Sequence, residues 1–87
     1  MISRTRPDFW RLFSRLDQAA QKAAREAYQR FLTDPAHPSL HFKKLGGYSN
    51  VWSVRISKQY RAVGERQGDK IVWAWIGTHN DFDRMFG

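Results

Sequence analysis

Two arginines and one histidine are the residues of this sequence best suited to chemistry. Arg55 and Arg61 flank a short turn between two stretches rich in β-branched and aromatic residues, a composition typical of paired strands. A three-residue loop would place them opposite each other on one face, where like charges are destabilising unless an anion joins them. His79 follows a third stretch of the same kind. Because guanidinium groups match phosphate oxygens and an imidazole can transfer a proton near neutral pH, these residues predict a phosphate site.

The same residues have simpler interpretations that the sequence leaves open. An arginine on a strand is commonly a solvated surface residue, and His79 before Asn80 and Asp81 could cap a helix. A metal site is not expected, because the three histidines lack ligand spacing and the chain has no cysteine. The position of His79 relative to the arginines therefore decides between catalysis and structure.

The charge of the chain favours an anionic partner. The formal net charge is +7, from 15 basic and 8 acidic residues. Between residues 41 and 66 the only acid is Glu65, against these basic residues: Lys43, Lys44, Arg55, Lys58, Arg61 and Arg66. Such an excess points first to nucleic acid, then to an anionic membrane or an acidic protein segment. No apolar run reaches the roughly 20 residues of a membrane span, so a cytoplasmic location is expected.

The elements that must position these residues follow from the period of the apolar side chains. Residues 9–32 repeat every three or four positions, which predicts a helical hairpin, or one helix bent near Asp17. After a loop with two prolines, four stretches alternate and predict strands: 40–45, 51–56, 60–66 and 71–77. A short helix at 81–86 should lie on the sheet through Phe82, Met85 and Phe86. The prediction is one α+β domain, residues 1–87, with two N-terminal helices on an antiparallel sheet of about four strands.

The order of these motifs resembles the RelE/ParE superfamily of bacterial type II toxins. The resemblance covers nearly the whole chain and is most specific at Arg55, at Tyr60-Arg61 and at Gly77-Thr-His79. It implies a small α+β toxin that an antitoxin, encoded beside it, neutralises in a hetero-oligomer. Many members cut messenger RNA in the ribosomal A site without a metal, whereas the ParE branch poisons DNA gyrase.

The resemblance also implies roles for individual residues. Arg55 and Arg61 match the arginines around the sheet hairpin, and His79 matches a histidine that serves as acid or base in several members. The resemblance further implies four RNA-binding residues: Lys43, Lys44, Arg66 and Phe82. The two lysines match the basic strand before the hairpin. Phe82 departs from the family, because some nucleases carry a tyrosine near this position, and a phenylalanine can stack on a base without transferring a proton.

Metal-free RNA cleavage is the interpretation that combines these features. It needs a base at the ribose 2′-hydroxyl, cations for the phosphorane and an acid for the departing 5′-oxygen. His79 can fill one proton-transfer role; Lys43, Lys44 and His41 are candidates for the other if they are desolvated. No cofactor is required.

Two alternatives stay open, a gyrase inhibitor and a basic nucleic-acid-binding module without catalysis. For the partner, we expect an acidic and apolar antitoxin helix over the surface from Lys43 to Arg61.

Overall fold

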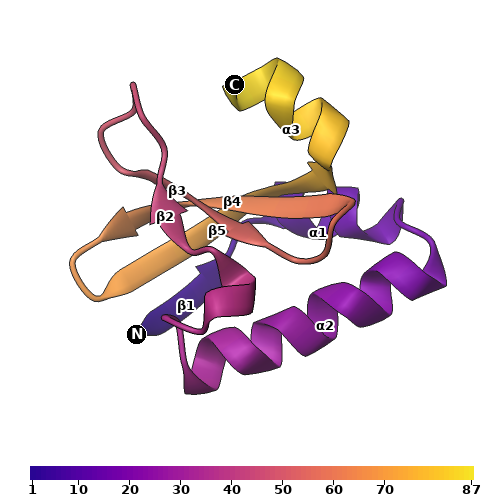
Figure 1. Cartoon of the computed structure of the whole chain (residues 1–87), viewed down its shortest axis with the longest axis horizontal. Helices are drawn as coiled ribbons and strands as arrows, with labels where there is room; N and C mark the ends of the chain where they lie inside the picture. The colour runs from indigo at the N-terminus through magenta and orange to yellow at the C-terminus, as the bar shows by residue number, and fades with distance from the viewer.

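Five strands, three α-helices and one 3₁₀ turn make up the computed structural model, which describes residues 1–87 (Figure 1). The strands are β1 (Ile2–Thr5), β2 (Lys43–Lys44), β3 (Val51–Arg55), β4 (Tyr60–Gln67) and β5 (Lys70–Thr78). The helices are α1 (Pro7–Ser14), α2 (Gln18–Thr33) and α3 (His79–Phe86), with the 3₁₀ turn η1 (Pro38–Leu40) before β2. The α+β class and the two N-terminal helices agree with the sequence prediction.

The sheet has the order β1-β5-β4-β3-β2 and is mixed. The last four strands pair antiparallel in chain order, as expected, and β1 adds a fifth strand parallel to β5. The backbone N–H of Ile2 donates to Asp69 O (2.7 Å) and that of Arg6 to Trp73 O (2.9 Å), which holds β1 at this edge. The predicted strand count of about four is therefore one too low.

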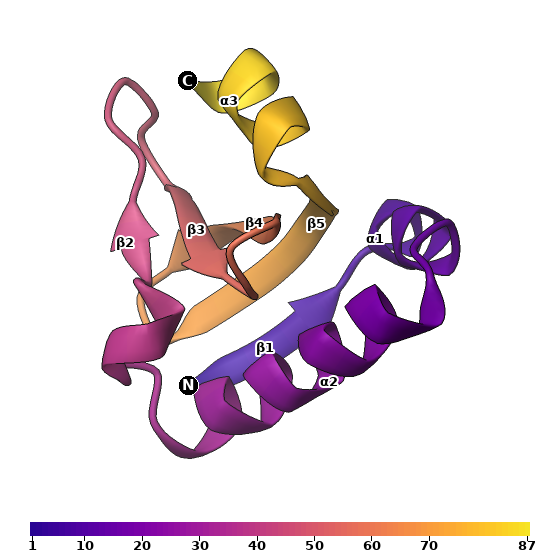
Figure 2. The same ribbon diagram turned by 45° about the vertical axis from the view of Figure 1, so that its right-hand side comes forward.

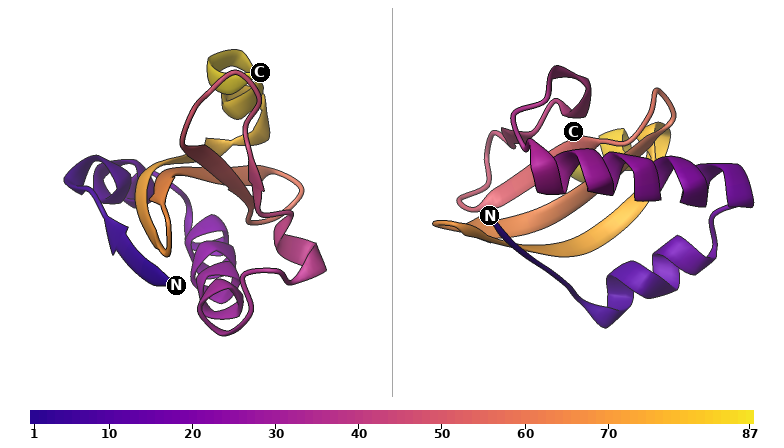
Figure 3. Two further views of the ribbon diagram at one scale, coloured as in Figure 1. Left: turned by 90° about the vertical axis from the view of Figure 1, so that its left-hand side faces the viewer. Right: turned by 90° about the horizontal axis from the view of Figure 1, so that it is seen from below.

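Helices α2 and α3 lie on opposite faces of the sheet (Figures 1 and 2). Asp17 begins α2 by accepting a hydrogen bond from the Ala20 N–H (2.8 Å), a typical N-cap that makes two helices rather than one bent helix. The helix buries residues spaced three or four apart, Ala20, Ala24, Ala27 and Phe31. Ala24, Ala27 and Phe31 pack with Val54, Ala62 and Ile76 of the sheet, and we call this side the α2 face. Figure 3 shows α2 crossing in front of the strands when the molecule is seen from below.

A β-bulge interrupts the alternation of β5, whose residues from Ile71 to Ile76 are all apolar. Val63 pairs with Trp75 and Gly64 with Trp73, so Ala74 is an extra residue and the alternation shifts there. Trp73 and Ile76 both enter the core on the α2 face. Trp75 instead contacts Phe86 of α3, on the opposite side of the sheet, which we call the α3 face (ring centroids 5.5 Å apart).

Two predicted elements differ in the structure. The strand expected at 40–45 is reduced to β2, because Pro38 starts the 3₁₀ turn, Leu40 turns fully into the core and His41 is left-handed with φ 43°. The final helix begins at His79 rather than at residue 81. It packs through Phe82 and Phe86, while Met85 is 55% exposed, so the expected contact of Met85 with the sheet is wrong.

No helix of the protein combines the length and the apolar character needed to cross a membrane.

Candidate active site

Arg55 and Arg61 face each other across the β3–β4 hairpin, as predicted. Their neighbours Val54 and Ala62 point into the core on the α2 face, so alternation places both guanidinium groups on the α3 face. Both side chains are half-buried and neither forms an ion pair. Burial lowers the pKa of Arg61, the positive charge of Arg55 lowers it further, and the carboxylate of Asp83 acts in the opposite direction. The pair is thus a concentrated positive charge that an anion would stabilise.

The hairpin turn fixes the position of the Arg61 guanidinium. Its Nη1 donates to the carbonyl oxygen of Ser57 (2.6 Å) and to that of Tyr60 (3.0 Å). These bonds use one of the guanidinium nitrogens, so the other N–H groups remain available to a ligand.

His79 is held beside the same hairpin turn. It is the first residue of α3, and its backbone N–H donates to Gln59 O (2.7 Å). Thr78, not His79, caps the helix, because the Thr78 hydroxyl accepts from the Asp81 N–H (3.1 Å). The capping interpretation of His79 is therefore wrong, and its imidazole is not used by the helix backbone.

The two ring nitrogens of His79 have different surroundings. Nε2 lies 3.2 Å from Oδ2 of Asp83, one helical turn further on, whereas Nδ1 is buried without a hydrogen-bond partner. The ring of Phe82 lies nearly parallel to the imidazole, with centroids 6.4 Å apart. Asp83 was missed by the sequence interpretation, although its spacing of four from His79 is the signal that would have found it.

A polar recess of ≈ 350 Å³ opens next to this histidine. Its lining comes from the hairpin turn and from the start of α3: Lys58, Gln59, Tyr60, Thr78, His79 and Asn80. The recess is large enough for a phosphate or a ribose, and Lys58 shares its lining with His79. Tyr60 lines it as well, although its side chain also packs against the hydrophobic core. No group of three or more histidine, aspartate or glutamate side chains gathers where it could hold a metal ion.

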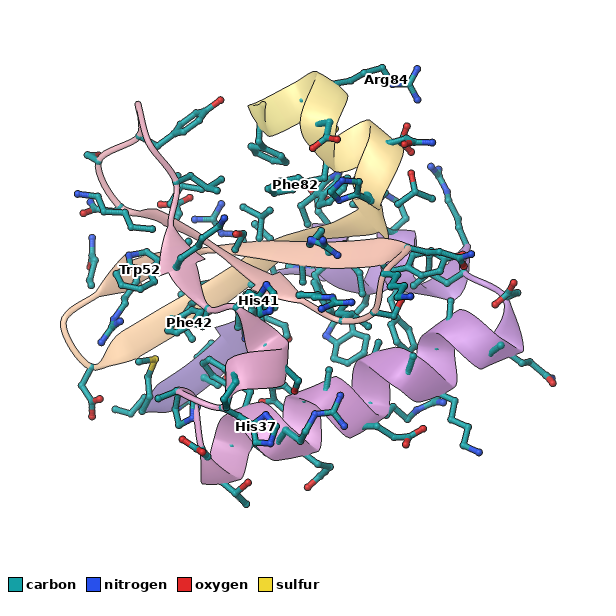
Figure 4. All side chains as sticks on the ribbon, in the orientation of Figure 1. His37, His41, Phe42, Trp52, Phe82 and Arg84 are labelled. Carbon is teal, nitrogen blue, oxygen red and sulfur yellow. The ribbon has the colours of Figure 1, made fainter.

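The predicted RNA-binding residues do not all share this face. Lys43 pairs with Ser53 and so lies on the α3 face, whereas Lys44 pairs with Trp52 and lies on the other. Arg66 is also on the α2 face, with its guanidinium carbon 4.5 Å from the Trp52 ring centroid. Figure 4 shows Phe82 under α3, on the side away from Trp52. Of the four residues, Lys43 and Phe82 are therefore on the side of the arginines.

A second recess, also of ≈ 350 Å³, lies among β1, α1, α2 and the α2 face, and we call it the apolar groove. Aromatic rings dominate its lining: Phe9, Trp10, Phe13, Tyr28, Phe31 and Trp73. Trp10 and Tyr28 are 51% and 38% exposed, and Arg4 and Arg25 complete the rim. An open groove of this composition is suited to an amphipathic protein segment.

Solved toxin structures share this fold. The RelB–RelE antitoxin–toxin complex from Methanococcus jannaschii matches 97% of this chain and 99% of that chain, with a TM-score of 0.76 and 18% identity. A YoeB/ParE toxin from Agrobacterium tumefaciens matches 91% of this chain and 99% of that chain, with a TM-score of 0.69 and 18% identity. The isolated E. coli RelE toxin matches 88% of this chain and 82% of that chain, with a TM-score of 0.65 and 14% identity. The fold is thus that of the RelE-like toxins.

The family follows from the sequence itself. Residues 18–84 match the model of the ParE-like toxin domain, which is most of the chain, so the protein belongs to the ParE-like toxin family and is a toxin of a toxin–antitoxin system. No curated protein matches the sequence.

Proposed function

We propose that the protein cleaves messenger RNA on translating ribosomes, that residues 1–87 act as one toxin domain in the cytoplasm, and that an antitoxin neutralises it in a hetero-oligomer. The observation that supports cleavage is the cationic pair of Arg55 and Arg61 beside a histidine that the helix does not use. The Gln59 backbone joins His79 to the turn that carries both arginines.

The arginines would bind the scissile phosphate. Guanidinium groups remain charged and match phosphate oxygens, so the pair lowers the energy of the pentacoordinate phosphorane as its negative charge develops. Arg61 is prepositioned by its bonds to Ser57 O and Tyr60 O, so little entropy is lost when the phosphate arrives. Lys43, on the same face at the sheet edge, would add long-range attraction for the RNA.

His79 would transfer one proton through Nε2. Its other nitrogen is sealed, so Nε2 is the atom that can meet either the 2′-hydroxyl or the departing 5′-oxygen. The partner in proton transfer would come from the polar recess, where Lys58 shares the lining with His79.

A DNA gyrase inhibitor is the second candidate, favoured by the match to the ParE-like family. Such a toxin blocks its target by binding and needs no proton-transfer group. A basic nucleic-acid-binding module without catalysis would be the third.

The apolar groove would hold the antitoxin. Its exposed aromatic residues need an apolar partner, and Arg4 and Arg25 at the rim favour acidic residues beside it. This differs from the surface that the sequence suggested, because the groove lies on the α2 face and the Lys43 to Arg61 surface lies largely on the other. The M. jannaschii toxin of the same fold was solved with its antitoxin, which supports a complex of this kind.

The test is to induce the protein in a bacterial host and follow amino-acid and thymidine incorporation at early times, with His79→Ala induced in parallel. A messenger ribonuclease stops translation first, and His79→Ala prevents the effect. Loss of DNA synthesis first, equal in both proteins, would establish the gyrase inhibitor. No effect on either process would leave the binding module.

A further inference from the structure

His79 offers a ligand only one of its two ring nitrogens. Nδ1 is buried and has no hydrogen-bond partner, although the side chain as a whole is 42% exposed. A substrate atom can therefore reach the imidazole only at Nε2. In the structure this position is taken by the carboxylate of Asp83, at 3.2 Å.

The Asp83 carboxylate has no other side-chain partner and is 57% exposed. It also lies close enough to Arg61 to raise the pKa of that guanidinium. The same carboxylate thus lies beside the proposed proton-transfer group and acts on one of the two arginines proposed to bind the substrate phosphate. A carboxylate and a phosphate compete for such donors, because both are anions that accept charge-assisted hydrogen bonds.

A carboxylate beside a histidine can instead orient it for catalysis. In that arrangement the carboxylate binds one ring nitrogen and the other nitrogen faces the reacting atoms. Here the other nitrogen is buried, so an orienting Asp83 would leave His79 with no nitrogen for the substrate. The geometry favours competition over orientation.

We propose that Asp83 is an internal competitor of the substrate phosphate, and that an RNA backbone reaches His79 only by displacing its carboxylate. The inference rests on the proposed function, in which Arg55 and Arg61 bind the phosphate and His79 transfers a proton. Exposed ion pairs one helical turn apart are weak, so displacement is easy for a polyanion held by two arginines and difficult for a lone weak anion. Asp83 would in this way make the site select extended RNA over free phosphate.

Asp81 provides a matched control. It lies in the same helix, carries the same charge and forms its own ion pair with Arg84, without contact to His79. Asp81→Asn and Asp83→Asn therefore change the net charge equally, and only the second removes the charge beside the imidazole.

The experiment titrates inorganic phosphate into the purified protein at physiological ionic strength and follows the imidazole ¹⁵N resonances of His79. Asp83→Asn should lower the Kd for phosphate about three- to tenfold, the order expected for removing one charge beside an exposed anion site. Asp83→Ala, which also removes the hydrogen-bond acceptor, should lower it at least as much. Asp81→Asn should change it less than twofold.

Equal effects of Asp81→Asn and Asp83→Asn would overturn the proposal, since net charge alone would then explain them. Weaker phosphate binding in Asp83→Asn would also overturn it and would indicate an orienting role. The readout does not depend on cleavage. If Asp83→Asn binds phosphate more tightly at His79 while no messenger is cut, internal competition stands and the ribonuclease function fails.

Discussion

The main chain rather than the side chain holds His79 in the site. Its N–H donates to Gln59 O and Thr78 caps the helix, so the imidazole can be removed without loss of either bond. A histidine placed in this way can be tested for chemistry with little risk that the variant fails to fold.

We expect His79→Ala to reduce messenger cleavage on translating ribosomes by about two to four orders of magnitude, the usual contribution of general acid–base catalysis. RNA affinity should change little, because the arginines remain. His37→Ala is the control for a distant histidine, since Figure 4 shows His37 near η1, where its Nδ1 accepts from the Ser39 N–H (3.2 Å), and far from Phe82 and α3. Primer extension on ribosome-bound messenger measures cleavage by both variants. Equal cleavage by the two variants would remove His79 from the mechanism.

Arg55→Ala should affect both the rate and the affinity. Loss of a guanidinium directed at the phosphorane should lower the cleavage rate by roughly two to three orders of magnitude, by analogy with the loss of one oxyanion donor. RNA binding should weaken as well. Arg15→Ala, an exposed arginine at the end of α1, removes the same charge away from the site and should alter only the salt-dependent part of binding. Single-turnover rates and filter binding separate the two effects; a purely affinity-level loss in Arg55→Ala contradicts the catalytic role.

Among the elements, the β4–β5 pair sets the geometry of the α3 face. The bulge at Ala74 turns Trp75 toward Phe86, and this contact supports the helix that begins with His79. Gly64 lies opposite the bulge, where the strands leave no room for a side chain. A Cβ at this position would come within 2.8 Å of Val72 O and 3.0 Å of the Trp73 ring.

Gly64→Ala should therefore destabilise the protein by about 1–3 kcal/mol, the cost of overpacking a core. Gly46→Ala is the control, since a Cβ at that position meets nothing within 4 Å, and its effect on the free energy of unfolding should stay below about 1 kcal/mol. Urea denaturation of both variants gives the comparison. Equal midpoints would mean that the strands shift freely at the bulge.

Period and turn chemistry made most of these elements predictable. Helix α2 has a capping aspartate and a regular alanine stripe, and the loop between Arg55 and Arg61 fixes their register. The strand β1 was not predictable, because four residues of mixed polarity form a strand only through pairing with β5, distant in sequence. The bulge was hidden for a different reason: a strand apolar on both parities gives no period that could reveal a shift.

The candidate site was predictable in its parts, although the predicted RNA-binding residues come from both faces of the sheet. Alternation correctly opposed Arg55 to Arg61, and it also indicates that Arg66 points to the other face, because it lies five positions from Arg61 in the same strand. The strand pattern does not say which of the two faces the helices cover. Arg66 stacks on Trp52 on the α2 face, away from the other two arginines. Asp83 lay outside the prediction because a carboxylate repels an anion and is not expected in a site that binds one.

For the whole molecule, the sheet separates two surfaces of different character. The arginines and His79 lie on the α3 face, and the apolar groove lies on the α2 face. A net charge of +7 attracts polyanions to either, but the groove combines exposed aromatic side chains with an apolar recess for a protein partner. Under the proposed function, the antitoxin and the RNA would be recognised by different forces on opposite sides.

Two exposed aromatic residues distinguish these surfaces. Trp10 stands at the mouth of the groove and is 51% exposed, whereas Tyr48 is 39% exposed and packs against Phe86 at the α3 face. If the antitoxin docks in the groove, Trp10→Ala should weaken binding roughly 30-fold or more, the loss expected of a buried aromatic anchor worth at least about 2 kcal/mol. Tyr48→Ala should change it less than about threefold. Isothermal titration with the antitoxin encoded beside the toxin gives both constants. The opposite ranking would place the antitoxin over the arginines, where it would block RNA directly rather than from the far side of the sheet.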